Sequence, residues 1–325
     1  MTRNDGPIAL EVTRGDLVES THRATVVLLG ADGTTAAALG DPEQTVFARS
    51  SWKPLQAVAL LRAGFSGDSA EVALACASHD GERVHLDTVR AVLEAAGLDE
   101  SALRCPAALP SGADALAAYL VSGGRPAAVC HNCSGKHAAM VATSVRNGWD
   151  LASYLAPEHP IQRAIAIELE SRCGAPITFT AVDGCGAPAH ALPLRSLAQG
   201  FSALTTARDP FATRVVTAMR SHPRLVGGSA RAVSDLLAEV DGLIAKDGAE
   251  GVWAAALPDG RAFAAKVADG SARALPPLLA AALTYWGFDG PAVRSWSAPA
   301  IIGGGEVVGA VRWAPSLRES LGMPR

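Results

Sequence analysis

The stretch GVWAAALPDGRAFAAKVA, residues 251–268, indicates the fold of this chain most directly. Two apolar runs, 251–257 and 261–268, flank a Pro-Asp-Gly turn at 258–260. An Asp-Gly turn between such segments is a strong signal for a β-hairpin. The C-terminal part of the chain therefore contributes antiparallel strands to a sheet.

Strand patterns occur mainly at the two ends of the chain, and helical patterns occupy the middle. The predicted strands are 8–14, 24–31, 34–39, 127–130, 177–182 and a last one that ends within 297–312. The Asp32-Gly33 pair predicts a hairpin turn between 24–31 and 34–39. The spacing of apolar residues predicts helices at 51–63, 69–77, 82–96, 112–121, 134–147, 160–173, 208–221, 229–240 and 274–286. We therefore predict an α/β (α+β) fold. One domain over residues 1–325 would carry a sheet built from both termini and a helical region between them.

The composition is that of a globular protein that handles a small molecule. Hydrophobic residues make up 49% and charged residues 18% of the 325 residues, which excludes intrinsic disorder. With 28 basic and 32 acidic residues the formal net charge is −4, so we expect neither nucleic acid nor an anionic membrane as a partner. No signal peptide or membrane-spanning stretch is predicted. We therefore expect a cytoplasmic location and reduced thiols for the six cysteines.

Lysine is scarce in this chain. Only Lys53, Lys136, Lys246 and Lys266 are lysines, and the other 24 of the 28 basic residues are arginines. Arginine stays protonated in proteins, whereas a buried lysine can lose its proton and act as a base or a metal ligand. Each lysine is therefore either a functional residue or an ordinary surface residue, and its sequence context has to decide between the two.

The first motif is RSSWKP, residues 49–54, which contains Ser-x-x-Lys as Ser50 and Lys53. Residues three apart at the start of a helix share a face, so the hydroxyl and the amine can meet. A lysine with a depressed pKa can then take the serine proton, as in serine β-lactamases. The alternative is a helix-capping serine followed by a solvated lysine.

The second motif is CASHDGE, residues 76–82. A Ser-His-Asp triad is not expected here, because adjacent residues do not face one another. Asp80 and Glu82 are interpreted as capping residues of the helix 82–96. Ser78 is kept as a candidate site residue.

The third motif is HNCSGKH, residues 131–137, with a second cysteine-bearing loop, DGCG, at 183–186. Thiolates from two loops can converge on one ion, and zinc favours thiolate ligands. The alternative is a set of buried, inert thiols.

The fourth motif, KDG at 246–248, precedes a strand as the Lys-Thr-Gly of β-lactamases does. The alternatives are a turn lysine for Lys246 and an outward-facing strand lysine for Lys266.

Together, these segments resemble the L-asparaginase II family of the rhizobial or thermolabile type. The resemblance rests on RSSWKPLQA, CASHDGE, HNCSGKHAAM, DGCGAP, SHPRLVGG and KDGAEGVWA, and it runs from about residue 8 to about residue 310. It implies a fold like that of serine β-lactamases and glutaminases. It also implies an L-asparaginase, a hydrolase that converts L-asparagine and water to L-aspartate and ammonia.

The resemblance also implies roles for particular residues. Two Ser-Lys pairs would be catalytic, Ser50 with Lys53 and Ser78 with Lys246. A Zn²⁺ cofactor would be held by Cys133, Lys136 and Cys185, and would organise the substrate pocket. Asp183 would receive the α-ammonium of the substrate, and Arg49 and His137 would also bind the substrate. His131 and Gly186-Ala187 depart from the family pattern, which leaves open an extra ligand or base at His131 and the shape of the pocket.

Three other functions remain open at this point. One is a glutaminase or broader Ser-Lys amidase on the same fold. Another is a hydrolase in which zinc-bound water attacks the substrate. The third is a sensor that binds asparagine without turning it over. We further expect the chain to form a homodimer.

Overall fold

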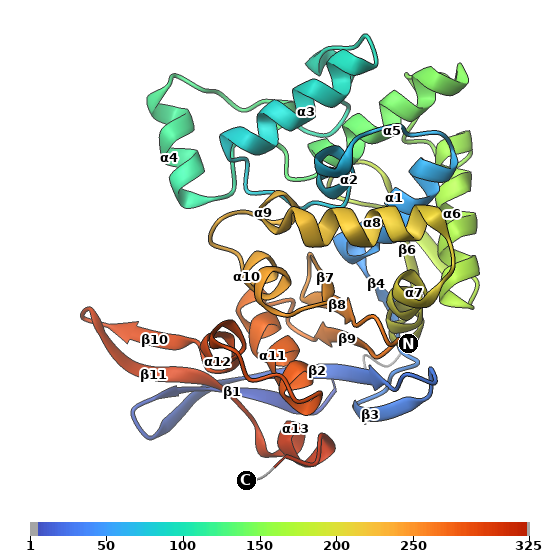
Figure 1. Ribbon diagram of the computed structural model, residues 1–325. Coiled ribbons are helices and arrows are strands. Elements are labelled where there is room, and N and C mark those ends of the chain that lie inside the picture. The colour runs from blue at the N-terminus through green and yellow to red at the C-terminus, as the bar shows by residue number, and fades with distance from the viewer. Residues whose placement is uncertain (1–5, 324–325) are drawn as a thin grey trace.

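A computed structural model describes residues 6–323 of the chain (Figure 1). Its larger sheet has eight strands in the order β10-β11-β1-β2-β9-β8-β7, with β3 paired to β2. A smaller sheet has the order β4-β6-β5. The strands are β1 (Ile8–Arg14), β2 (Leu17–Leu29), β3 (Thr35–Leu39), β4 (Thr45–Phe47), β5 (Phe179–Val182), β6 (Pro188–Pro193), β7 (Ile244–Gly248), β8 (Val252–Ala256), β9 (Ala262–Val267), β10 (Ala300–Gly303) and β11 (Glu306–Trp313).

The larger sheet joins the two ends of the chain. Strand β2 pairs antiparallel with β9, with Val26 opposite Ala265, and β1 pairs with β11, with Leu10 opposite Trp313. The two predicted hairpins are present, β2–β3 and β8–β9. In the second hairpin Gly260 has a φ of 95°, a backbone conformation that favours glycine. The predicted α/β (α+β) sheet with a helical region is confirmed.

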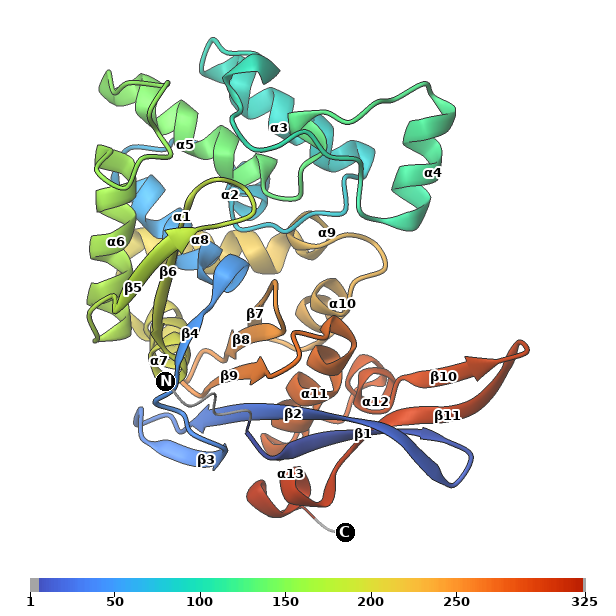
Figure 2. The same cartoon turned by 180° about the vertical axis from the view of Figure 1, so that it is seen from behind.

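The helices form a layer above the sheet and cover its faces (Figures 1 and 2). Helix α7 packs on β8 and β9, α11 packs on β9, β8 and β11, and α10 packs on β7. The helices are α1 (Lys53–Arg62), α2 (Ser69–Ala75), α3 (Arg83–Ala95), α4 (Ala113–Val121), α5 (Ser134–Asn147), α6 (Pro160–Cys173), α7 (Leu194–Thr206), α8 (Pro210–Ser221), α9 (Pro223–Val226), α10 (Ala232–Glu239), α11 (Leu275–Tyr285), α12 (Pro291–Ser297) and α13 (Pro315–Ser320). Short 3₁₀ helices are η1 (Arg49–Trp52), η2 (Glu100–Ala102), η3 (Ala128–Cys130) and η4 (Ala272–Ala274).

Local sequence explains several of these boundaries. Helix α2 starts with a capping box, in which Asp68 accepts from the backbone of Glu71 and Glu71 accepts from the backbone of Asp68. Helices α5 and α6 have the predicted bounds, and each is followed by a glycine in the left-handed conformation, Gly148 or Gly174.

Two local predictions were wrong. The strand predicted at 127–130 is the 3₁₀ helix η3, and only Ala127 makes a single β-bridge, to Ala108. Four consecutive apolar residues do not distinguish a strand from a buried turn, and in residues 6–323 the isolated bridge to Ala108 is the β-pairing of this segment. The helix predicted at 51–63 starts later, because 49–52 forms η1 and α1 begins at Lys53.

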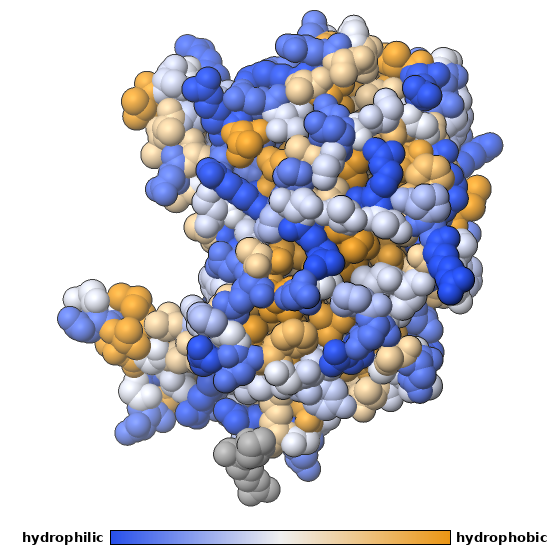
Figure 3. Space-filling model, in the orientation of Figure 1, coloured by the Kyte–Doolittle hydropathy of each residue, from blue (hydrophilic) through white to orange (hydrophobic). Residues whose placement is uncertain are grey.

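The surface is mixed in polarity, and apolar side chains are prominent on the projecting β10–β11 hairpin (Figure 3). Ile302 and Val307 in this hairpin are 56% and 68% exposed. In residues 6–323, no helix has the length and apolar character needed to cross a membrane.

Candidate active site

The predicted catalytic residues come from three segments that meet between the helical layer and the edge of the larger sheet. Lys53 is the first residue of α1 and is 1% exposed, and Ser50 lies in the preceding η1 and is half-buried. Ser78 follows α2 and is buried, and Lys246 lies on the edge strand β7 with no exposed surface. The structure thus places the side chains of both predicted catalytic lysines in its interior.

The side chain of Lys53 reaches the loop after α2. Its Nζ lies 3.2 Å from Ser78 Oγ and also donates to the backbone carbonyl of Ala77. Within the described residues Lys53 Nζ makes no hydrogen bond to Ser50 Oγ, although Ser50 lies in η1 directly before α1. The bond from Lys53 to Ser78 therefore connects the two predicted Ser-Lys pairs.

Ser50 is not a capping residue. Neither η1 nor α1 has a side-chain hydrogen bond at its N-terminal cap, and Trp52 occupies the cap position of α1. The capping interpretation of Ser50 is therefore wrong, and its hydroxyl is available for another role.

Lys246 is held by strand β7 itself. Its Nζ donates to Asp247 Oδ1 at 2.6 Å and to the carbonyl of Asp247 at 2.7 Å. Ser51 Oγ donates to the carbonyl of Lys246 at 3.0 Å, which ties the start of α1 to β7. A Cβ at Gly248 would lie 2.4 Å from the carbonyl oxygen of Ala48, so this close approach of η1 to β7 requires glycine. The turn-lysine interpretation of Lys246 is therefore wrong.

Burial controls the charge state of Lys246. Loss of hydration lowers the pKa of its amine to about 8; the Asp247 carboxylate opposes this shift, and the nearby Lys53 adds to it. Lys246 therefore exchanges its proton at a pH much closer to neutral than an ordinary lysine does. That is the property a proton-relaying group needs.

Arg49 and Asp183 form an ion pair beside the serines. Arg49 Nη2 lies 2.7 Å from Asp183 Oδ1, and Asp183 sits in the turn between β5 and β6. Arg49 has a φ of 52°, which is uncommon for a residue other than glycine, and it directly precedes Ser50. Such backbone strain is often found at functional sites. Two predicted substrate-binding residues therefore lie together next to the predicted nucleophile.

The three predicted metal ligands also lie together. Lys136 Nζ is 3.4 Å from Cys185 Sγ, and all three side chains are buried. A hydrogen bond from Cys185 lowers the pKa of the Cys133 thiol well below its usual value, against the effect of burial and with help from the Lys53 cation. Burial opposes the charged form of Lys136, but Cys185, Cys133 and Asp183 together outweigh it and raise the pKa of this amine.

This donor set fits zinc in its two sulfur atoms, since one of them readily becomes a thiolate. Over residues 6–323 no group of three His, Cys, Asp or Glu side chains could hold a metal ion. A metal at this place would therefore need the neutral amine of Lys136 as its third protein ligand.

The histidines of the HNCSGKH motif have separate surroundings. His137 is fully buried on α5, and its Nδ1 lies 2.6 Å from the hydroxyl of Tyr154. Burial, followed by the Lys136 cation, lowers its pKa well below the usual value, so the imidazole is neutral. Its Nε2 is buried and has no partner among the described residues. His131 accepts at Nδ1 from the backbone N–H of Cys133 at 3.0 Å, so this nitrogen shapes the loop.

Lys266 donates hydrogen bonds to two backbone carbonyls. It lies on β9, and its Nζ donates to the carbonyls of Glu250 and Val267, both at 2.6 Å. Glu250 has a φ of 61° in the β7–β8 turn. Lys266 therefore supports an unusual turn conformation near β7.

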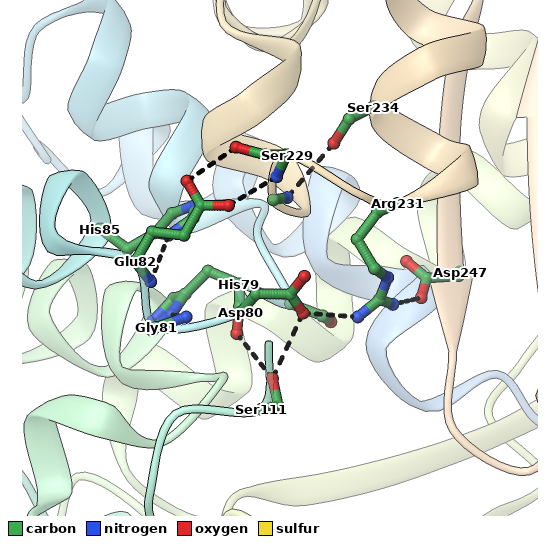
Figure 4. A network of polar contacts seen from close by, with 12 residues as sticks. His79, Asp80, Gly81, Glu82, His85, Ser111, Ser229, Arg231, Ser234 and Asp247 are labelled. Carbon is green, nitrogen blue, oxygen red and sulfur yellow. Dashed lines mark hydrogen bonds and ion pairs between the residues drawn. The ribbon is translucent and has the colours of Figure 1, made fainter. Parts of the chain in front are cut away.

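Three polar residues next to the site were missed or misinterpreted from sequence. Asp80 does not cap α3; its carboxylate binds Arg231, and Glu82 is the N-cap residue (Figure 4). Arg231 also binds Asp247, the neighbour of Lys246. An acidic residue directly after a candidate lysine is a signal that could have indicated Asp247, whereas Arg231 is brought in only by the tertiary fold.

Buried Ser-Lys contacts of this kind are typical of hydrolases that use lysine to activate serine. The comparison with protein families is more specific: residues 10–313 match the family described as L-asparaginase II, and the chain belongs to this family. Membership of it supports a hydrolase that acts on amides. A comparison with curated proteins finds no significant match.

Two solved structures show the range of similar folds. The structure of Mglu in its native form is 16% identical, with a TM-score of 0.45, and the match covers 83% of this chain and 66% of the Mglu chain. A β-lactamase from Mycobacterium bovis, Mb2281c, is 15% identical, with a TM-score of 0.38, and the match covers 82% of this chain and 95% of that chain. This chain thus spans slightly less than two thirds of Mglu, and similarities at this level carry no argument about function.

Proposed function

We propose that the protein hydrolyses the side-chain amide of L-asparagine to L-aspartate and ammonia through an acyl-enzyme on Ser50. The observation that carries the proposal is the buried amine of Lys53, three residues after Ser50 and 3.2 Å from Ser78 Oγ. This contact joins one member of each predicted Ser-Lys pair and supports proton exchange between the pairs. The family match supports the amide as the substrate class.

The chemical steps follow from these groups. In the reacting form of the enzyme Lys53 is deprotonated and accepts the proton of Ser50 Oγ, and this oxygen attacks the side-chain carbonyl carbon of asparagine. Ser78 and Lys246 relay a proton to the amide nitrogen, the C–N bond breaks, and ammonia leaves. Water then attacks the ester, which releases L-aspartate and restores Ser50. The pKa of about 8 at Lys246 suits a group that both gives and takes a proton in this cycle.

The Arg49–Asp183 pair supports an amino acid as the substrate. A zwitterion carries one ammonium and one carboxylate, and this pair offers a carboxylate and a guanidinium 2.7 Å apart. In our proposal Asp183 binds the α-ammonium and Arg49 binds the α-carboxylate. His137, neutral and buried with a free Nε2, is the third proposed substrate-binding residue.

We propose Cys133, Lys136 and Cys185 as the residues that hold a zinc ion. Bound zinc would fix the two loops relative to each other and screen the charge of the cysteine thiolates. Cys185 lies two residues after Asp183, so ordering this loop places the carboxylate that receives the substrate. Zinc is thus proposed as an organiser of the pocket.

The experiment measures hydrolysis by the purified protein of three separate substrates: asparagine and glutamine by ammonia release, and a β-lactam by the absorbance change on ring opening. The proposal expects asparagine to be preferred and L-aspartate to form in equal amount to ammonia. Preference for glutamine would establish a glutaminase instead. Asparagine that binds tightly and stays intact after prolonged incubation would establish a sensor and overturn the proposal.

A further inference from the structure

Arg231 links two segments that carry proposed catalytic residues. Its Nη1 lies 2.9 Å from Asp80 Oδ1, in the loop after α2, and its Nη2 lies 2.6 Å from Asp247 Oδ2, on β7 (Figure 4). Asp247 Oδ1 in turn accepts from Lys246 Nζ at 2.6 Å. A continuous chain of charged contacts therefore runs from Asp80 through Arg231 and Asp247 to Lys246.

The surrounding backbone leaves space for the Asp80 carboxylate, which lies at one end of this chain of contacts. A Cβ at Gly228 would lie 2.5 Å from Asp80 Oδ2, and a Cβ at Gly112 would lie 2.9 Å from Asp80 Cβ. Ser111 Oγ also donates to Asp80 Oδ1 at 3.3 Å. Two glycines thus make room for this carboxylate, which lies two residues after Ser78. Fixing Asp80 therefore restrains the loop that presents the Ser78 hydroxyl.

We propose that Arg231 is a positioning residue that holds the Ser78 loop against strand β7. It thereby fixes the position of the Lys246 amine relative to the Ser78 hydroxyl. The catalytic meaning of this inference rests on the proposed function. Arginine suits this position better than lysine, because its planar fork holds two carboxylates in a fixed geometry, whereas a lysine ammonium acts as a compact point charge. The Arg231 side chain is 35% exposed, so it closes the chain of contacts from the solvent side.

The charged groups around Lys246 make its pKa a measure of the position of Arg231. Burial, Lys53 and Arg231 lower the pKa of Lys246, and Asp247 opposes them. Cys76 also lies near Lys246 as a buried thiol whose pKa is raised to about 12 by burial, so it stays neutral. The remaining charged groups on elements packed against β7 are engaged elsewhere: Arg49 with Asp183, Arg214 with the carbonyl of Gly67, Arg220 with Asp241, Asp235 with Trp296, and Glu239 with the start of α12. Loss of Arg231 removes a cation and frees Asp247, and both changes raise the pKa of Lys246.

The first test compares Arg231→Gln and Arg231→Lys with the control Arg224→Gln. Arg224 is a 65%-exposed neighbour that binds Glu82, outside the chain of contacts to Lys246. We expect Arg231→Gln to lower kcat by about 10- to 100-fold, as for a misplaced reacting group, with little change in KM. The limb of the pH profile that reports Lys246 should move to higher pH. Arg231→Lys should show a smaller loss, and Arg224→Gln should match the wild type.

The second test measures Lys246 directly and needs no activity. Lysine labelled with ¹³C at Cε gives four NMR signals to assign in this chain, through Lys→Arg variants, and the shift of each signal reports protonation. We expect the Lys246 signal to titrate at higher pH in Arg231→Gln than in the wild type or Arg224→Gln. Should Arg231→Gln not fold, the comparison is made with Arg231→Lys.

The outcomes separate the inference from the proposed function. An unchanged Lys246 titration, with only a loss of thermal stability, would overturn the inference and leave Arg231 a structural residue. A wild type that hydrolyses none of the three assayed substrates would overturn the proposed function, and the NMR titration would still decide the role of Arg231.

Discussion

Lys53 Nζ lies 3.2 Å from Ser78 Oγ, although Lys53 opens α1 and Ser78 follows α2. This contact unites two motifs that are 25 residues apart in the sequence. The serine three residues before Lys53 remains without a side-chain hydrogen bond in the described part of the chain. Ser50 is thus free to meet a substrate while Lys53 is already oriented by the neighbouring loop.

Alanine substitutions of the adjacent Ser50 and Ser51 should have separate effects, one on activity and the other on stability. Ser50→Ala should abolish ammonia release with little change in the free energy of unfolding, because the hydroxyl is half-buried and caps no helix. Ser51→Ala should keep most of the activity and lose about 1–3 kcal/mol of stability, because it leaves the carbonyl of Lys246 without its buried donor. Ammonia assays and urea unfolding of both variants check this. Near-normal turnover by folded Ser50→Ala would remove Ser50 from the mechanism.

Lys53→Arg should be nearly as inactive as Lys53→Ala. Arginine keeps the positive charge but does not give up its proton, so it cannot act as a base. The side chain is 1% exposed, and the larger guanidinium also has to fit beside Ala77 and Ser78. Circular dichroism should therefore accompany the rate measurement, with Lys266→Arg as a control on β9. A folded Lys53→Arg protein with wild-type turnover would place the base elsewhere.

Lys246→Met should remove activity and change how stability depends on pH. Burial lowers the pKa of Lys246 from 10.5 to about 8 in the folded protein. Between these values the unfolded chain binds the proton and the folded chain does not. The free energy of unfolding of the wild type should therefore rise with pH across this window, relative to Lys246→Met. Urea unfolding of both proteins at several pH values tests this; a difference that stays constant from about pH 8 to 10 would contradict the buried amine.

Zinc content should depend on two of the six cysteines. Cys133→Ser and Cys185→Ser should each lose bound metal, because a serine hydroxyl stays protonated where a thiol becomes a thiolate. Cys105→Ser and Cys173→Ser are the matched controls, since these thiols are equally buried and their pKa values are raised by burial. Elemental analysis that finds full zinc in both Cys133 and Cys185 variants would refute the site.

The kinetics of the zinc-free protein show what the metal does. If zinc organises the pocket, its removal should raise KM for asparagine more than it lowers kcat. A maximal rate that falls by more than about 100-fold at saturating asparagine, about 2.7 kcal/mol, would favour attack by zinc-bound water.

Much of the fold could be predicted because its signals are local. Asp-Gly turns between apolar runs predicted both hairpins, and apolar periodicity predicted α5 and α6 to the residue. Helix α7 was missed although Leu194, Leu197, Ala198 and Phe201 have helical spacing and are buried. Strand β7 was missed because Lys246, Asp247 and Gly248 show no strand pattern, and its pairing with β8 decides its conformation.

The site was predicted as a set of residues but not as a network. Motif resemblance selected the serines, the lysines and the cysteines, and the structure brings Lys53 to Ser78 and Lys136 to Cys185. The motifs could not predict that Lys53 contacts Ser78, 25 residues away in the sequence. Nor could they predict that Arg231 contacts both Asp80 and Asp247, which are 151 and 16 residues away from it. The expected homodimer and cytoplasmic location stay predictions.

The most direct measurement of the central claim is the residue labelled by a diazoketone analogue of asparagine, in which a diazomethyl ketone replaces the side-chain amide. A nucleophilic serine converts this reagent to a stable ether, so no short-lived ester has to be trapped. The account predicts stoichiometric inactivation that asparagine prevents, with the label on Ser50 by peptide mass spectrometry and none on Ser50→Ala. A label on Ser78 or Cys133 instead, or no inactivation of a protein that hydrolyses asparagine, would contradict an acyl-enzyme on Ser50.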